Sequence, residues 1–199
     1  MTRLPPFIRR LARDDGAATA TEFGLVCFAF VSMLLAVIDM GRLGWTINTA
    51  KTATREGVRL AVVSPMIASA MANYDGLTQN IPGGGTAPNV TFSCAGSSSS
   101  CTQTAGTTLA GNTFNNSTFN AVVTKMQHYD PEITAAKVTV TYHHVGIGRV
   151  GNPYAPDMEP LVSVSVTGLT FQSAALQIFG VAPFTLPTMT STLSGESLS

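Results

Sequence analysis

The stretch that decides how this chain is organised is DDGAATATEF, residues 14–23, which runs directly into the apolar segment FGLVCFAFVSMLLAVI, residues 23–38. The apolar segment contains no charged residue, and arginines precede the whole stretch at positions 3, 9, 10 and 13. A secretory signal peptide also places basic residues before an apolar run, but its small residues and its cleavage point follow that run. Here the small residues come first, which disfavours a cleaved secretory signal.

The apolar segment is predicted to cross a membrane. Residues 16–38 carry no charge except Glu22, and a spanning helix needs about 17 to 25 residues. The arginines before the segment place the N-terminus in the cytoplasm by the positive-inside rule, so the bulk of the chain lies outside. A carboxylate inside such a segment costs free energy, and a plain bitopic anchor has no use for it. The alternative is a plain anchor in which Glu22 snorkels to the cytoplasmic interface.

Three short motifs follow one another along the N-terminal region. They are EF at residues 22–23, DMGR at residues 39–42 and ATREGVRLA at residues 53–61. In this order and spacing they resemble the TadE-like pseudopilins of the tight-adherence (Flp) type IV pilus system. The resemblance extends from position 16 to about position 61, and the small residues before the glutamate are similar to the end of a type IV prepilin leader.

The resemblance implies that residues 1–16 form a prepilin-type leader, which a prepilin peptidase removes. In the family pattern, processing follows a glycine, and the glutamate is the fifth residue of the mature chain. Cleavage after Gly16 makes Glu22 the sixth residue, whereas cleavage after Ala17 makes it the fifth. The candidate processing site therefore comprises Gly16, Ala17 and Ala18, with two positions open for the cut.

The resemblance also implies a role for the motif at residues 22–23. In the family, the matching glutamate pairs with the free N-terminal amine of a neighbouring subunit. Carried to this chain, subunit docking falls on Glu22 and Phe23, with the new amine on Ala17 or Ala18. The implied partners are other pilins or pseudopilins, the prepilin peptidase, the pilus assembly machinery of the bacterial inner membrane, and membrane lipid. The expected function is that of a minor pseudopilin in pilus assembly, which is the substrate of an enzyme rather than an enzyme and needs no cofactor.

The helix is expected to continue beyond the membrane. Small and apolar residues at positions 43, 47, 50, 54, 58 and 61 recur at steps of three and four, which is typical of one face of an amphipathic helix. Lys51, Arg55 and Arg59 form a charged stripe on another face, which we interpret as solvated rather than as a binding surface. Proline removes a backbone donor and crowds the preceding turn, so the helix is predicted to end between Pro65 and Tyr74.

The region between Asp75 and Lys125 has no charged residue and is rich in Gly, Ser, Thr and Asn. This composition predicts loops and short edge strands. The spacing of Cys94 and Cys101 permits a disulfide that closes a hairpin, and an extracytoplasmic location would allow it to form. Zinc ligation is the alternative for these two cysteines, but it needs two further ligands.

The rest of the chain predicts a small α+β head. A helix begins near Ser117 and is ended by Pro131, with an apolar face at steps of three and four. Alternating valines predict two antiparallel strands at residues 138–143 and 162–167. A short helix over residues 171–179 and an extended segment ending at residues 190–193 follow. The predicted organisation is a pilin-like lollipop, with a leader at 1–16, a long N-terminal helix at 17–72 whose transmembrane segment is 23–38, and an extracytoplasmic head at 73–199 that packs a small antiparallel sheet on the helix.

Composition and motifs argue against nucleic-acid binding and catalysis. Only 11% of the residues are charged, against about 25% in soluble proteins. The net charge is zero, and the sequence has no basic patch that would predict a nucleic-acid partner. Adjacent histidines on a strand, His143 and His144, point to opposite faces and cannot both bind one metal. No metal site or catalytic residue is expected. Two rival hypotheses are an unprocessed bitopic protein that binds another envelope protein, and an anchored hydrolase that uses the histidine region, with His128, Asp130, Asp157 and Glu159 as further candidates.

Overall fold

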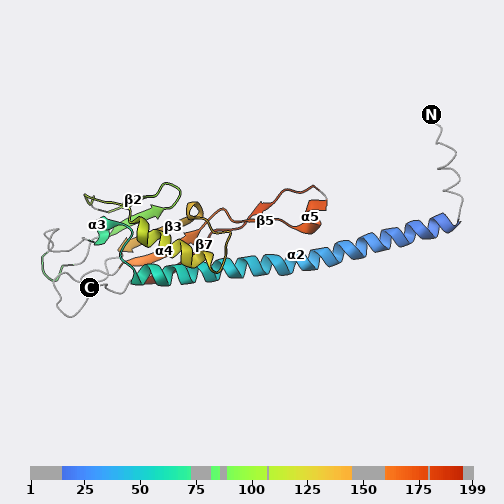
Figure 1. The fold of residues 1–199 in the computed structure, drawn as a ribbon, viewed down its shortest axis with the longest axis horizontal. Coiled ribbons are helices and arrows are strands. Elements are labelled where there is room, and N and C mark those ends of the chain that lie inside the picture. The colour runs from blue at the N-terminus through green and yellow to red at the C-terminus, as the bar shows by residue number, and fades with distance from the viewer. Residues whose placement is uncertain are drawn as a thin grey trace, which may run out of the picture. The chain divides into compact units, whose positions relative to one another are not determined.

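The computed structural model describes residues 15–72, 82–85, 89–106, 108–144, 160–178 and 180–194. The chain divides into two compact units, which we describe separately. Unit 1 comprises Met1–Gly44 and Gln172–Pro183, and unit 2 comprises Trp45–Phe171 and Phe184–Ser199. A single long helix, α2, contributes to both units (Figure 1). Residues 1–14 of the predicted leader lie outside the described residues.

Helix α2 runs from Asp15 to Val63, a length of 49 residues. It contains no proline, and its C-terminus falls two residues before Pro65, because the residue that precedes a proline is disfavoured in the helical conformation. A short helix, α3 (Ser69–Ala72), follows after a break. The helix therefore ends earlier than the range from Pro65 to Tyr74 that the sequence predicted.

Unit 2 is built on a five-stranded antiparallel sheet with the order β2-β1-β3-β4-β7. The strands are β1 (Val90–Ala95), β2 (Ser100–Ala105), β3 (Val138–His144), β4 (Leu161–Val166) and β7 (Met189–Ser194). The predicted pairing of the two valine-rich strands is confirmed, with Val140 opposite Val164. The sequence predicted loops and short edge strands between positions 75 and 125, and this prediction was wrong for β1. This strand lies between β2 and β3, because Val90, Phe92 and Cys94 alternate and are all buried.

One face of the sheet is covered by the second half of α2 and by α4 (Asn116–Gln127) (Figure 1). The hydroxyl of Thr54 on α2 lies 3.0 Å from that of Ser191 on β7. A side-chain carbon added at Gly57 would lie 2.8 Å from the Met126 side chain on α4, so glycine allows these two helices to approach closely. The predicted face of α2 is confirmed, since Ala50, Thr54, Val58 and Ala61 are buried. The long helix packed on an antiparallel sheet is the predicted α+β, pilin-like arrangement.

Two shorter pieces complete the described fold. The helix expected at residues 171–179 is shorter, because Phe171 belongs to β5 (Thr170–Phe171), which pairs with β6 (Phe184–Thr185). The helical part is α5 (Ala174–Ile178), and Gly180 follows it with a φ of 71°, a left-handed conformation that favours glycine after a helix. A 3-10 turn, η1 (Ala135–Lys137), leads into β3. Helix α4 starts as predicted, capped by the Asn115 side chain, which accepts a hydrogen bond from the Thr118 backbone.

Candidate functional site

The candidate docking residues Glu22 and Phe23 both lie on the first part of α2 and are exposed, Phe23 by 72%. Glu22 forms no ion pair with any residue that the structure describes. The large apolar side chains that follow are exposed as well, except for the half-buried Leu35. Within Ala18–Val63 an 18-residue window reaches a mean hydropathy of 2.3. A helix that is apolar all round and unburied needs lipid or another protein to cover it. The exposed set comprises Phe23, Leu25, Val26, Phe28, Phe30, Val31, Met33, Leu34, Val37 and Ile38.

The candidate processing residues lie in the first turns of the same helix. Because α2 begins at Asp15, Gly16, Ala17 and Ala18 are all helical, and Ala18 is exposed. The peptide bonds after Gly16 and Ala17 therefore lie at the very start of the helix, where the first four N–H groups have no partner within the helix. Cleavage at either bond stays a prediction.

A site that the sequence did not predict lies where the apolar segment ends. Asp39 is only 6% exposed. Its Oδ2 accepts hydrogen bonds from the Ser173 hydroxyl at 2.6 Å and from the Ala175 backbone N–H at 2.7 Å, and its Oδ1 accepts one from Arg42 at 3.3 Å. All four residues belong to unit 1. The sequence shows a carboxylate directly after the apolar run. Its neighbours in sequence do not indicate which residue, more than a hundred positions away, it contacts.

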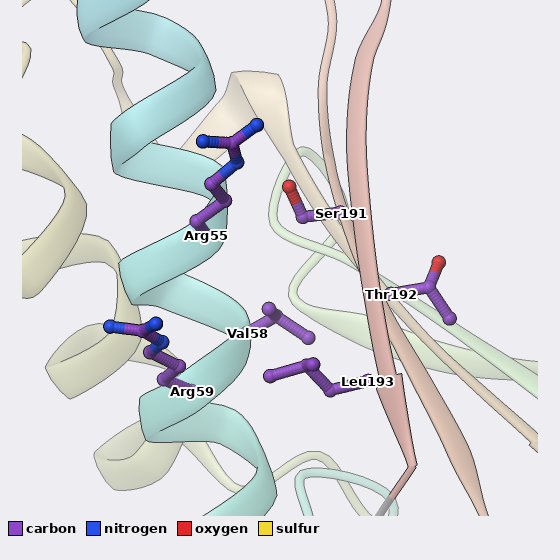
Figure 2. A pocket seen from close by; sticks show the side chains of 6 residues that line it. All are labelled: Arg55, Val58, Arg59, Ser191, Thr192 and Leu193. Carbon is purple, nitrogen blue, oxygen red and sulfur yellow. The ribbon is translucent and has the colours of Figure 1, made fainter.

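The charged stripe of α2 lies beside a shallow groove in unit 2. Lys51, Arg55 and Arg59 are exposed, as predicted, and Arg59 pairs with Glu56 at 2.9 Å. The groove has a volume of about 300 Å³ and lies between α2 and β7. Figure 2 shows Val58 and Leu193 facing each other across it. It is lined by Arg55, Val58, Arg59, Ser191, Thr192 and Leu193.

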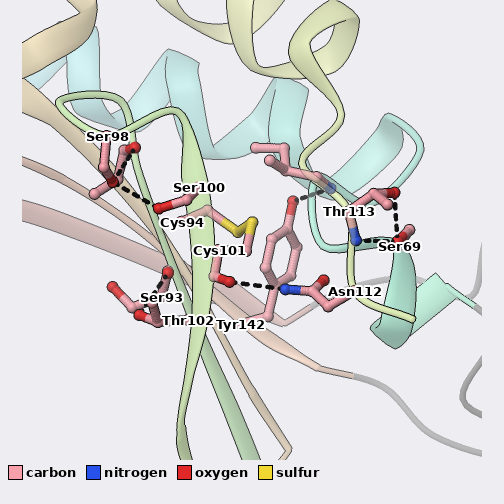
Figure 3. Close-up of a disulfide and its surroundings, with 12 residues drawn as sticks. Ser69, Ser93, Cys94, Ser98, Ser100, Cys101, Thr102, Asn112, Thr113 and Tyr142 are labelled. Carbon is pink, nitrogen blue, oxygen red and sulfur yellow. Dashed lines mark hydrogen bonds between the residues drawn. A yellow bond between two sulfur atoms is a disulfide. The ribbon is translucent and has the colours of Figure 1, made fainter. Parts of the chain in front are cut away.

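The predicted disulfide between Cys94 and Cys101 is present and joins neighbouring strands β1 and β2 at directly paired positions (Figure 3). The turn that it closes contains Ser98, whose hydroxyl lies 2.7 Å from that of Ser100. The carbonyl of Cys101 also accepts a hydrogen bond from Asn112 at 2.8 Å. With both sulfurs in the disulfide, these residues are not available as zinc ligands. The remaining cysteine, Cys27, is free and exposed on α2.

The histidine region does not form a common site in the described residues. His143 and His144 point to opposite faces of β3, as predicted: His144 is buried, while His143 lies near the surface with its Nε2 3.0 Å from the Asn89 side-chain oxygen. Burial, together with the neighbouring His143, lowers the pKa of His144 to about 4. Asp157 and Glu159 lie outside the described residues. Within the described parts of the chain, no group of three His, Cys, Asp or Glu side chains could hold a metal.

Tyr142 is a further buried polar residue of β3. Its hydroxyl accepts a hydrogen bond from the Ile67 backbone N–H at 3.1 Å, and this bond fixes the chain just after the end of α2. Burial raises the pKa of Tyr142 to about 12, so the phenol stays neutral at physiological pH. Its role is structural, because it satisfies a backbone donor beside the core.

A comparison with known families identifies the N-terminal part of the chain. Residues 16–59 match the family described as TadE-like protein. The match begins at the candidate processing site, includes Glu22, Phe23 and Asp39, and ends within the sheet-packed part of α2. The predicted resemblance is thereby confirmed over this segment. No curated protein and no solved structure matches the chain.

Proposed function

We propose that this chain, a member of the TadE-like family by residues 16–59, is a minor pseudopilin that takes part in assembling a Flp (tight-adherence) pilus. It is inserted in the bacterial inner membrane with its N-terminus in the cytoplasm and its head outside. A prepilin peptidase trims it after Gly16 or Ala17. The observation that carries the proposal is that the family match falls on an unburied apolar helix in which Glu22 is the only charged residue between positions 16 and 38.

The dimensions of α2 support this placement. Residues 18–38 of the helix span about 31 Å at 1.5 Å per residue, which matches a hydrocarbon core of about 30 Å. Glu22 then lies about one turn inside the cytoplasmic boundary, where an acidic side chain costs less than at the bilayer centre. A carboxylate at that depth gains most from a cation at the same level. The new N-terminal amine of a neighbouring, processed subunit would supply one.

The rival functions find less support. An anchored hydrolase would need the histidines to converge, but His144 is buried on one face of β3 and His143 lies on the other. An unprocessed bitopic anchor fits the apolar helix equally well but gives no role to Glu22. The proposed partners are therefore other pilins or pseudopilins, the prepilin peptidase and the inner-membrane assembly machinery, and the chain itself is a substrate rather than an enzyme.

Replacing Glu22 by glutamine separates docking from anchoring. Glu22→Gln should leave insertion and processing intact, because a neutral amide is easier to bury than a charge. It should abolish piliation, because the attraction that aligns neighbouring subunits is gone. Pili on the cell surface are counted by electron microscopy while immunoblots follow the processed protein in membranes.

The matched control is Glu56→Gln, on the same helix. It removes the exposed ion pair with Arg59, a kind of pair that contributes little to stability, and it should leave piliation normal. Normal piliation in the Glu22→Gln strain, with processing confirmed, would exclude the docking role and favour the plain anchor.

A further inference from the structure

The segment 172–183, of which the structure describes every residue except 179, includes α5 and is hydrogen-bonded to α2 just after the apolar run ends. Asp39 accepts hydrogen bonds from the Ser173 hydroxyl, the Ala175 backbone and Arg42. The Ser173 hydroxyl in turn accepts a bond from the Leu176 backbone N–H at 3.1 Å, which caps α5. A carboxylate that is nearly removed from water is tolerated only when its oxygens are hydrogen-bonded. These hydrogen bonds therefore fix the position of the segment along the axis of α2, at Asp39.

The segment carries no charge, and it exposes three large apolar side chains beside the polar Gln172 and Gln177. Leu176, Ile178 and Val181 are exposed by 43%, 63% and 47%, and residues 172–183 include no Asp, Glu, Lys or Arg. On α2, Val37 and Ile38 lie directly before Asp39 and are exposed by 63% and 57%. The segment thus places its apolar side chains at the level along α2 where the exposed apolar surface of the helix ends. A patch that continues a lipid-facing surface is most simply covered by the same lipid.

The depth follows from helix geometry. When residues 18–38 fill the hydrocarbon core, Asp39 lies at its outer boundary, where acyl chains give way to headgroups. Arg42 lies one turn further out and its side chain is exposed by 56%, so its charge reaches the headgroup region. Amphipathic segments bind at this depth, with their apolar side chains at the boundary between headgroups and acyl chains and their polar side chains toward water.

We propose that segment 172–183 lies in the outer interface of the membrane, with Leu176, Ile178 and Val181 in contact with lipid, and that Asp39 is the positioning residue that holds it there. This inference rests on the membrane insertion of α2 in the proposed function. It adds a second membrane contact, which comes from near the C-terminal end of the chain rather than from the N-terminal helix.

Fluorescence quenching by lipid tests the contact in the full-length protein. An environment-sensitive dye is attached at position 178 in an Ile178→Cys, Cys27→Ala protein, which is inserted into phosphatidylethanolamine and phosphatidylglycerol vesicles that contain acyl-chain nitroxide lipids. A dye on the native Cys27 reports insertion of α2. A dye at Thr124→Cys in the Cys27→Ala background, on an exposed position of α4, reports exposure to water. We expect blue-shifted emission at 178 with strong quenching by shallow nitroxides, quenching of Cys27 by deep nitroxides, and neither effect at 124.

Each other outcome overturns a specific step. Water-like emission at 178 with normal quenching at Cys27 would refute the lipid contact and leave the pseudopilin proposal intact. Blue-shifted emission at 178 without nitroxide quenching would assign the patch to a second protein surface instead of lipid. If the dye at Cys27 is not quenched either, α2 is not inserted, and both the membrane placement in the proposed function and this inference fail.

The role of Asp39 is tested by the same measurement. Asp39→Ala removes the Oδ2 acceptor that Ser173 and Ala175 share, so quenching at position 178 should be largely lost while quenching at Cys27 is unchanged. Arg42→Ala removes the longest of the three contacts to Asp39 and should retain most of the signal. Asp39→Asn, which keeps one acceptor oxygen, should restore part of it. If Asp39 only stabilised α2, replacing it would change the nitroxide quenching at Cys27 as well. Unchanged quenching at 178 in the Asp39→Ala protein would remove Asp39 from the proposal.

Discussion

The two halves of α2 form one continuous helix but follow different rules. In the first half, from Asp15 to Gly44, most of the large apolar side chains are exposed and Leu35 and Leu43 are half-buried. The only buried residue among those whose burial is described is Asp39. In the second half, from Trp45 to Val63, one face of small and apolar residues is buried against the sheet and α4, and the charged residues lie on another face. The first half shows hydrophobicity without a periodic pattern, whereas the second shows a periodic pattern with modest hydrophobicity. The exposed apolar side chains of the first half therefore need a partner from outside the chain, while the buried face of the second half packs against the sheet and α4 of the same chain.

Acidification should destabilise the head, because His144 is buried there. The pKa of His144 is about 4 in the folded head and about 6.5 when unfolded, so the unfolded chain binds more protons between these values. The free energy of unfolding should therefore fall as the pH drops from about 6.5 to about 4, by up to about 1.4 kcal/mol per unit and about 3 kcal/mol in total. Thermal unfolding of the full chain in detergent, followed between pH 7.5 and pH 5, measures the slope.

A matched pair of histidine variants assigns this slope to its source. His144→Leu should flatten the pH dependence, whereas His128→Gln, at an exposed position, should preserve it. An equal slope in wild type and His144→Leu would show that another group titrates in this range.

Two valines on the same helix compare its halves directly. Val58 is 1% exposed and Val37 is 63% exposed. Val58→Ala should lower the free energy of unfolding of the head by about 2 to 3 kcal/mol, because it removes buried methyl groups and leaves a cavity. Val37→Ala should change it by less than about 0.5 kcal/mol. Denaturant melts of the two full-length variants in detergent check both values, and similar losses would contradict the division of α2 into two environments.

The disulfide should stabilise the head by a smaller amount. Closing a loop of this length contributes about 2 to 2.5 kcal/mol in the chain-entropy model, so a Cys94→Ala, Cys101→Ala protein should lose about that much. Cys27→Ala, which changes the free thiol of the apolar half, should lose nothing measurable in head stability. Peptide mapping with and without reduction identifies the pairing in protein taken from cells. Free thiols at both positions there would contradict the pairing and argue against an extracytoplasmic head.

Sequence reasoning succeeded where the signal was local and failed where a contact was distant. The steps of three and four in α2, the alternation in β3 and β4, and the spacing of Cys94 and Cys101 each report a local geometry, and the structure confirms them. The central position of strand β1 was not predicted, because the strand lies in a region rich in glycine and serine, although Val90, Phe92 and Cys94 do alternate. The contact of Asp39 with Ser173 joins residues 134 positions apart, and no periodic pattern can report such a pairing.

If the apolar half of α2 is a processed pseudopilin segment, the N-terminal residue of the protein recovered from cell membranes must lie at the candidate processing site. Intact-mass and N-terminal analysis should find a mature chain that begins at Ala17 or Ala18. Separate substitutions Gly16→Val and Ala17→Val then identify the residue before the cut, with Gly24→Val, at an open position of the same helix, as the control that is still processed. Recovery of a chain that begins at Met1, or beyond Ile38, would contradict the account.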